Sequence, residues 1–295
     1  MIVITEDDHS ISMDTPAKVN LYLHVLGRRA DGYHDIDSVF QAVSLYDRLT
    51  LTRRDRAGMD LSVEGNGLPC DESNLIVQAF RVVDRHCSLE GGVDAIVVKR
   101  VPIAAGLGGG SSDAAGTIFA LNSLFDLGLD ARSMARIGAE IGSDVPFFFS
   151  GGQARVGGRG EIVESTDLPL DYSLALVTPA LSISTAAAYS DLKMGLTETM
   201  APFNLPRCRS AGELWTSLGH SGNDFERVQV SAHPVLAEVR QALANSGARL
   251  VRMSGSGPTV CGFFDNKPPV ELSVLSAREG WQLYVVKPIK YNIKV

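Results

Sequence analysis

The most constraining feature of the sequence is a glycine-rich loop between a strand pattern and a helix pattern. Four of the five residues 106–110 are glycine. Glycine adopts positive φ readily and has no side chain to hold a ligand away from the backbone. Residues 95–98 before the loop predict a short buried strand, and the apolar spacing over residues 114–125 predicts a helix. Because N–H groups at a helix N-terminus attract anions, the segment predicts a phosphate-binding site.

The loop matches neither of the common nucleotide-binding fingerprints. The pattern G-x-x-x-x-G-K-[ST] needs a lysine where Gly110 stands. The pattern G-x-G-x-x-G, begun at Gly106, needs a glycine where Ser111 stands. Taken alone, the loop is therefore as compatible with a tight turn that binds nothing as with a phosphate cradle.

A second segment, residues 16–23, alternates apolar and polar positions near the N-terminus. The alternation predicts a half-buried strand with Lys18, Asn20 and Tyr22 on the face opposite the apolar side chains. On its own this pattern indicates no more than a surface lysine on a polar strand face.

Two further segments carry polar groups in unusual settings. Residues 27–34 form a polar loop in which Tyr33 and His34 stand side by side. Asp144 stands between a glycine turn and the aromatic run of residues 145–149, which we expect to be buried. A carboxylate that enters an apolar core needs a partner, because an unpaired buried charge is costly. A lysine is the expected partner.

Together these segments resemble the GHMP kinase superfamily, whose ATP loop reads P-x-x-x-G-L-G-S/G-S-S. Within it they are similar to the branch whose alcohol substrate carries a cytidine diphosphate group and belongs to the non-mevalonate isoprenoid route. The resemblance extends from about residue 14 to about residue 265, with small departures at residues 104–105 and 143. The segments that carry it are P-A-K-V-N-L (16–21), R-R-A-D-G-Y-H (28–34), P-I-A-A-G-L-G-G-G-S-S (102–112), G-S-D-V-P-F-F (142–148) and M-S-G-S-G-P-T (253–259).

The resemblance implies a set of site residues. Phosphoryl transfer to an alcohol requires neutralised phosphate charge, an aimed hydroxyl and a group that takes its proton. By resemblance, Asp144 is the base and Lys18 its partner, while ATP is the co-substrate, with Mg²⁺ held by ligands that the sequence does not define. The implied ATP-binding residues are Pro102, Ile103, Ala104, Ala105, Gly106, Leu107, Gly108, Gly109, Gly110, Ser111, Ser112, Asn74 and Lys99, the last two at the adenine or ribose. The implied substrate-binding residues are Asn20, Tyr33, His34 and Tyr189, with the two tyrosines stacking on cytosine and His34 hydrogen-bonding its edge.

The mixture of strand and helix patterns predicts an α+β fold. The resemblance implies a two-domain form of it, an N-terminal ribosomal-protein-like domain with a left-handed βαβ unit and a C-terminal ferredoxin-like domain. We expect residues 1–166 to form the first domain and residues 167–295 the second. The resemblance also implies a glycine turn at residues 253–259 that lies against the phosphate loop. Residues 223–226 match the family as well, and we interpret them as structural.

Local patterns predict further elements along the chain. Residues 11–65 predict short strands and turns, and residues 190–230 show no clear pattern. The other predicted elements are a helix capped by Ser73-Asn74 that ends near residue 86, a helix from Asp130 to about 142, a hairpin in 150–165, a strand at 174–177, a helix at 234–246, and strands at 251–253, 259–264 and 281–286.

Composition excludes several classes of protein. The net charge of −7 argues against a nucleic-acid-binding surface, so any nucleotide must be bound by a local site. No apolar run approaches the roughly 18 residues of a membrane span, and the N-terminus lacks the apolar segment of a secretory signal. The four scattered cysteines, with no C-x-x-C pair, indicate a reduced cytoplasmic protein without structural zinc. The sequence does not define the oligomeric state.

Two alternative functions stay open at the level of sequence. A sister GHMP kinase that acts on homoserine, mevalonate or a sugar would share the glycine loop, but it would not need Tyr33 and His34. A non-catalytic ATP-binding sensor on the same scaffold would be expected to lack Lys18 or Asp144, and both are present.

Overall fold

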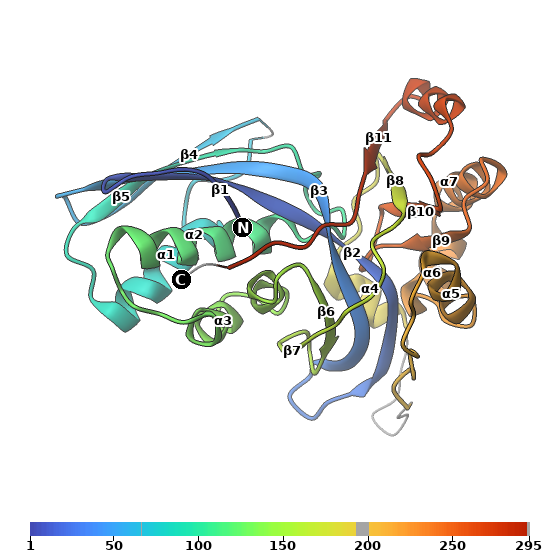
Figure 1. Cartoon of the computed structure of the whole chain (residues 1–295), viewed down its shortest axis with the longest axis horizontal. Helices are drawn as coiled ribbons and strands as arrows, with labels where there is room; N and C mark the ends of the chain where they lie inside the picture. Colours follow the sequence, from blue (N-terminus) through green and yellow to red (C-terminus); the bar gives the residue numbers. More distant parts are fainter. Residues whose placement is uncertain (66, 193–200, 294–295) are drawn as a thin grey trace.

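The chain forms two β-sheets with helices packed on them (Figure 1). The computed structural model describes residues 1–65, 67–192 and 201–293. Part of the patternless region, residues 193–200, lies outside the described residues. The α+β class is confirmed. Among the described helices, none is long and apolar enough to cross a membrane.

The larger sheet is built from the N-terminal half of the chain. Its main path runs in the order β1-β2-β3-β5-β4, while β6 pairs with β3 and β7 pairs with β6. Helices α1 and α2 cover one face of this sheet (Figure 1). The strands are β1 (Ile2–Glu6), β2 (Ser10–Arg28), β3 (His34–Arg54), β4 (Gly58–Glu64), β5 (Gly92–Val98), β6 (Gln153–Gly157) and β7 (Ile162–Ser165), and the helices are α1 (Leu75–Cys87), α2 (Gly109–Leu124), α3 (Ala131–Ala139) and the 3-10 helix η1 (Val145–Phe149).

Two long strands replace the short strands predicted over residues 11–65. Strand β2 has 19 residues and β3 has 21, and they pair antiparallel along almost their whole length. The prediction of a half-buried strand at residues 16–23 is also wrong, because Lys18, Asn20 and Tyr22 are all buried. This part of β2 is covered on both faces, since Ala17, Val19 and Leu21 belong to an apolar core while the turn at residues 254–255 covers Asn20. Alternation in the sequence therefore separates two buried faces here, not a buried face from a solvent face.

The predicted strand–loop–helix unit is confirmed. Strand β5 leads into the glycine loop, and α2 begins at Gly109. The strand is only partly buried, because Ile96 faces away from the core and is 44% exposed. Strands β4 and β5 are parallel and are joined through α1, which makes the expected βαβ unit. Asn74 caps α1 as predicted, with its side chain accepting the N–H of Ile76.

The smaller sheet has the strand order of a ferredoxin-like fold. Its four antiparallel strands lie in the order β11-β8-β10-β9, and helices separate β8 from β9 and β10 from β11. The predicted strands and the helix near residues 234–246 are confirmed. The elements are β8 (Ser173–Pro179), β9 (Leu250–Met253), β10 (Val260–Phe264), β11 (Trp281–Val286), α4 (Thr185–Asp191), α5 (Ala211–Leu218), α6 (Asp224–Ala232), α7 (Pro234–Asn245) and the 3-10 helix η2 (Val270–Ala277).

The segment after β11 returns to the first sheet, as the dark red trace in Figure 1 shows. Its backbone bonds to β3, with the N–H of Ser44 donating to Lys287 O at 2.9 Å. Further along, the N–H of Tyr291 donates to Gly151 O at 3.0 Å, beside β6. The boundary between residues 166 and 167 remains our proposal for the division of the chain, and residues 287–291 cross back over it.

Candidate active site

A cavity of about 1070 Å³ contains most of the predicted site residues. The glycine loop, the N-terminal end of α2 and residues before α1 line one part of it, and Tyr33, His34 and α4 line another. Lys18 and Asp144 line it as well. Only Leu107 and Ser112 of the predicted site residues do not line the cavity, and both side chains are buried. The structure therefore does not support a direct contact of these two side chains with ATP.

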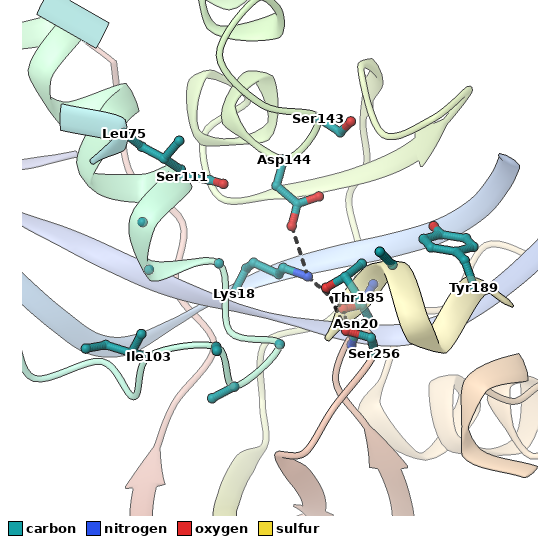
Figure 2. A pocket seen from close by; sticks show the side chains of 18 of the residues that line it. Lys18, Asn20, Leu75, Ile103, Ser111, Ser143, Asp144, Thr185, Tyr189 and Ser256 are labelled. Carbon is teal, nitrogen blue, oxygen red and sulfur yellow. Dashed lines mark hydrogen bonds and ion pairs between the residues drawn. The ribbon is translucent and has the colours of Figure 1, made fainter. Parts of the chain in front are cut away.

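Lys18 is held at the centre of this cavity (Figure 2). Its ammonium group donates to Asn20 Oδ1 at 2.9 Å and lies 3.3 Å from Asp144 Oδ2. It also lies 4.3 Å from the centroid of the Phe40 ring, a distance at which the ring face attracts a cation. The Lys18 side chain is 4% exposed, so its position is determined by these contacts.

Asp144 differs from its partner because it keeps access to the cavity. It stands directly before η1, whose Phe147 and Phe148 side chains are fully buried. The Asp144 side chain is 31% exposed. The predicted partner, a lysine, is confirmed, whereas the carboxylate is less buried than the neighbouring aromatic run suggests. A carboxylate in this position can still accept a hydrogen bond from a bound molecule.

Asn20 connects Lys18 to a second glycine turn. Its Oδ1 accepts the N–H of Gly255 at 2.9 Å, while its Nδ2 donates to Ser38 Oγ at 2.9 Å. The side-chain hydroxyl of Ser254 donates to Gly106 O at 2.8 Å. The glycine turn that the resemblance placed against the phosphate loop thus contacts it directly. Of residues 223–226, Asn223 is structural as predicted, because its side chain donates to the carbonyls of Met253 and Gly255 and caps α6, whereas Phe225 lines the cavity.

The backbone of the phosphate loop requires its glycines. Gly106 and Gly108 have φ of +75° and +69°, which only glycine adopts easily. A Cβ at Gly106 would stand 2.0 Å from Ser254 O, and one at Gly108 would stand 2.9 Å from Lys18 Cγ. Ala104 also has a positive φ, of +51°, an uncommon conformation for a residue with a side chain. Gly108 is the N-cap of α2 and provides no side-chain cap, so the first N–H groups of the helix are left for a ligand.

At the other end of the cavity lie three of the four residues predicted to bind the substrate, Tyr33, His34 and Tyr189, whereas the fourth, Asn20, lies beside Lys18. The rings of His34 and Tyr189 are stacked, with centroids 4.7 Å apart. Tyr33 is 51% exposed, and the guanidinium of Arg159 lies 5.0 Å from its ring centroid. Burial lowers the pKa of His34, and the charge of Arg28 lowers it further. A neutral imidazole can both donate and accept hydrogen bonds, which suits the edge of a base.

Tyr189 lies close enough to Asp144 for its ionisation to depend on that carboxylate. Burial raises the pKa of Tyr189 to about 12, and the charge of Asp144 contributes to the rise. The phenol is therefore neutral at ordinary pH and presents an aromatic face and a hydroxyl group. It packs edge-on against Phe225, with ring centroids 4.9 Å apart.

Three residues of the site escape sequence reasoning. Thr185 Oγ1 lies 3.0 Å from Ser256 Oγ, and both line the cavity (Figure 2). Arg159 belongs to the hairpin between β6 and β7, where glycines dominate the local pattern. Thr185 and Arg159 stand in no distinctive spacing, so no local sequence signal could have identified them. Ser256 belongs to the segment 253–259, for which the resemblance predicted a turn against the phosphate loop but no contact of this side chain.

The prediction that Lys99 contacts adenine or ribose through its ammonium group is not supported. Its side chain is 2% exposed, and the ammonium group donates to the buried carboxylates of Asp47 and Asp113. Asn74 does line the cavity, but its side chain is engaged by the N–H of Ile76 and by Pro69 O. Within the described part of the chain there is no group of three or more His, Cys, Asp or Glu side chains arranged to hold a metal ion.

Comparisons with known proteins decide the family. Residues 74–152 match the model of the GHMP kinases N terminal domain, and residues 206–279 match that of the GHMP kinases C terminal domain. A curated relative from Syntrophotalea carbinolica, named 4-diphosphocytidyl-2-C-methyl-D-erythritol kinase, is 37% identical over 93% of this chain and 97% of its own length. The chain belongs to this family of GHMP kinases.

Other members and solved structures agree with this assignment. The relative from Syntrophus aciditrophicus carries the same name and is 38% identical over 93% of this chain and 98% of its own length. A crystal structure of 4-(cytidine 5'-diphospho)-2C-methyl-D-erythritol kinase has a TM-score of 0.74 at 30% identity and covers 94% of this chain and 99% of its own. A homoserine kinase from Cytophaga hutchinsonii shares the fold, with a TM-score of 0.72 at 17% identity over 98% of each chain.

Proposed function

We propose that this GHMP kinase transfers the γ-phosphoryl group of ATP to the 2-hydroxyl of 4-diphosphocytidyl-2-C-methyl-D-erythritol, a step of the non-mevalonate isoprenoid route. The observation that carries the proposal is the Lys18–Asp144 pair at 3.3 Å in one cavity, between a glycine loop and a group of aromatic side chains. The Asp144 carboxylate, which can accept a proton, therefore lies between a loop suited to phosphate and aromatic side chains suited to a nucleobase.

On the donor side, the phosphates of ATP lie along the glycine loop. The positive φ of Gly106 and Gly108 directs backbone N–H groups toward the ligand, and the dipole of α2 favours negative charge at its N-terminus. The hydroxyl of Ser111 lines the cavity at this helix end and can donate to a phosphate oxygen. These groups replace the lysine of the common phosphate loop.

The chemical step needs a proton acceptor and charge stabilisation. The substrate oxygen forms a bond to the γ-phosphorus while the bond from that phosphorus to the bridging oxygen of ATP breaks, which releases ADP. Asp144 accepts the proton of the attacking hydroxyl, because one side of its carboxylate is open to the cavity. The ammonium of Lys18 stabilises the negative charge that moves across the transferring group.

On the acceptor side, the aromatic group binds the cytosine of the substrate. Tyr33 offers an exposed ring face, and the stacked pair of His34 and Tyr189 offers ring faces and polar edges. Base–aromatic stacking contributes about 1–3 kcal/mol per base. A kinase of homoserine or mevalonate has no base to stack, so this group distinguishes the proposed substrate from those.

The oxygen donors at the loop suit a magnesium ion that arrives with the nucleotide. Mg²⁺ usually keeps several waters and is bound through one or two carboxylates together with substrate phosphates, so it needs no cage of protein ligands. The hydroxyl of Ser111 is a hard oxygen donor that lines the cavity at the loop. We propose that this hydroxyl and the phosphates of ATP would hold the ion, which would neutralise phosphate charge and leave the Asp144 carboxylate free for the substrate hydroxyl.

We further propose that the enzyme acts in the cytoplasm. Its four cysteines, Cys70, Cys87, Cys208 and Cys261, are all free thiols, as expected in a reducing compartment.

A coupled assay of ADP release tests the proposed function. The purified chain is given ATP and Mg²⁺ with 4-diphosphocytidyl-2-C-methyl-D-erythritol, homoserine or mevalonate as the acceptor. We expect ADP release that depends on the cytidine substrate and is absent with the other two. ADP release with homoserine or mevalonate in preference would overturn the assignment of the acceptor. Binding of ATP without transfer to any acceptor would favour a sensor.

A further inference from the structure

A cluster of three buried charges lies against the glycine loop and takes no part in the proposed phosphoryl transfer. The Lys99 ammonium group lies between the carboxylates of Asp47 and Asp113 and donates to both, at 2.6 Å to Asp113 Oδ2. The three side chains are between 0 and 3% exposed. A Cβ at Gly109, the first residue of α2, would stand 3.3 Å from Asp47 Oδ2. The cluster thus lies directly against the start of the helix.

Hydrogen bonds from the cluster reach three parts of the nucleotide site. Asp47, on β3, accepts the backbone N–H groups of Arg100 and Val101 at 2.6 and 2.9 Å, where the chain enters the loop. Asp113, on α2, accepts the hydroxyl of Thr15 at 2.7 Å. Thr15 is on β2, three residues before Lys18. The cluster therefore joins the entrance of the loop, the helix after the loop and the strand that carries the reactive lysine.

The charges of the cluster make it sensitive to the loss of any member. Burial raises the pKa of Asp113 to about 6, while the charge of Lys99 opposes the rise and the charge of Asp47 adds to it. Burial lowers the pKa of Lys99, but the two carboxylates more than offset this effect and leave the pKa above its usual value. Removing the ammonium would leave two carboxylates facing each other in the interior, which is strongly unfavourable.

We propose that Lys99 is a positioning residue for ATP, which acts by holding Asp47 and Asp113 together so that the N–H groups of the loop and of α2 face the phosphates. The inference rests on the proposed kinase function. The Lys99 ammonium is not placed in direct contact with adenine, because two of its three donors are engaged by the carboxylates of Asp47 and Asp113. The loop lacks a phosphate-binding lysine of its own, so its affinity depends on how accurately its backbone is held.

Kinetics of four variants test this role. Lys99→Met should raise KM for ATP at least 10-fold, while KM for the cytidine substrate stays within about twofold of wild type. Asp113→Asn added to Lys99→Met removes one of the two opposed carboxylates, so the double variant should recover at least half of that loss on a logarithmic scale. Asp113→Asn alone should raise KM for ATP about threefold or more. Lys290→Met is the matched control: Lys290 pairs with Asp167 at 2.8 Å on the surface, and its loss should change neither KM.

Each result decides the matter. A Lys99→Met enzyme with KM for ATP within twofold of wild type would overturn the positioning role. A double variant no better than Lys99→Met would overturn it in favour of a direct contact with the nucleotide. If Lys99→Met does not fold, Asp113→Asn alone decides, and an unchanged KM for ATP overturns the inference. Failure of the wild-type chain to bind ATP, measured as an unshifted melting temperature, would instead refute the proposed function.

Discussion

Two buried lysines lie beside the glycine loop, and they differ in the number and the exposure of the carboxylates that they face. Lys18 is 4% exposed and faces a single carboxylate, that of Asp144, whose side chain is 31% exposed. Lys99 is 2% exposed and faces the carboxylates of Asp47 and Asp113, which are almost completely buried. The first is an open pair and the second a closed cluster.

The exposure of the partner carboxylates suits the two lysines to different roles. A carboxylate with an exposed oxygen can accept a proton from a bound hydroxyl, so the open pair suits chemistry. In the closed cluster, protein groups occupy both carboxylates, and Asp47 accepts two backbone N–H groups as well. Such a cluster holds backbone segments in place and offers little to a ligand. Residue type alone would not separate the two lysines; the exposure of their partners does.

The comparison predicts that the largest effect on turnover comes from the open pair. Asp144→Asn keeps the shape of the side chain but removes the proton acceptor, so both substrates should still bind while kcat falls by about 10²–10⁴-fold. Single-turnover rates, with separate titrations of ATP and of the cytidine substrate, measure the two parts. A variant that turns over within about fivefold of wild type would exclude Asp144 from the chemistry.

Lys18→Met should reduce kcat by a comparable factor, since Lys18 and Asp144 act as one unit. Their effects should then be far from additive, and the double variant should be little slower than either single one. Losses of kcat that add in the double variant would mean that Lys18 and Asp144 act independently and do not form one catalytic unit.

The second prediction concerns the loop that lies between the two lysines. Gly108→Val should weaken ATP binding by about 100-fold or more, because the new side chain would stand in the phosphate site and against Lys18 Cγ, 2.9 Å from its Cβ. Isothermal titration with ATP measures the loss. Gly128→Val is the matched control: Gly128 has a similar φ, +65°, with nothing within 4 Å of its Cβ. Equal losses of affinity in both variants would assign the effect to backbone strain.

The third prediction tests whether Tyr33 binds the cytosine of the substrate whose hydroxyl reacts at the Lys18–Asp144 pair. Tyr33→Ala should raise KM for the cytidine substrate by about 5- to 150-fold, the equivalent of about 1–3 kcal/mol of lost stacking, with little change in KM for ATP. Tyr33→Phe keeps the ring and should stay close to wild type. Because Tyr33 is 51% exposed, neither change should unfold the protein. A loss confined to ATP would move this aromatic side chain to the donor side.

Local sequence signals predicted the phosphate loop and its surroundings well. Asn74 and Asp130 cap α1 and α3 as expected, because capping depends on a side chain and N–H groups two or three residues away. A lysine partner for Asp144 followed from the cost of a carboxylate next to an aromatic core, and the resemblance identified that lysine as Lys18. The resemblance added the aromatic residues at the far end of the cavity, which local patterns could not have connected.

Long-range packing accounts for what the sequence did not predict. The length of β2 and β3 and the burial of both faces near Asn20 depend on an apolar core and on the turn at residues 254–255, which lie against the strand only in the folded protein. The direct contact expected of the Lys99 ammonium is not supported because this group pairs with Asp113 and with Asp47, which is 52 residues away in sequence. No local pattern distinguishes a lysine that meets a ligand from one that meets two buried carboxylates.

The smallest expected effect is a pH dependence that belongs to the closed cluster alone. The pKa of Asp113 is raised to about 6, chiefly by burial, so the native state binds a proton more tightly than the unfolded chain does. The contribution of Asp113 to the free energy of unfolding therefore falls as pH rises from about 4 to 6. Asp113→Asn should remove that fall, changing the slope by less than about 1.4 kcal/mol per pH unit, the value for one whole proton. Urea unfolding at several pH values measures both slopes.

Asp167→Asn provides a contrast of opposite sign. A hydrogen bond from Lys290 lowers the pKa of the exposed Asp167, so the contribution of Asp167 to stability is lost as pH falls. Parallel pH profiles for wild type and Asp113→Asn would show that Asp113 stays ionised in the native protein, and that Lys99 balances the cluster more completely than its burial suggests.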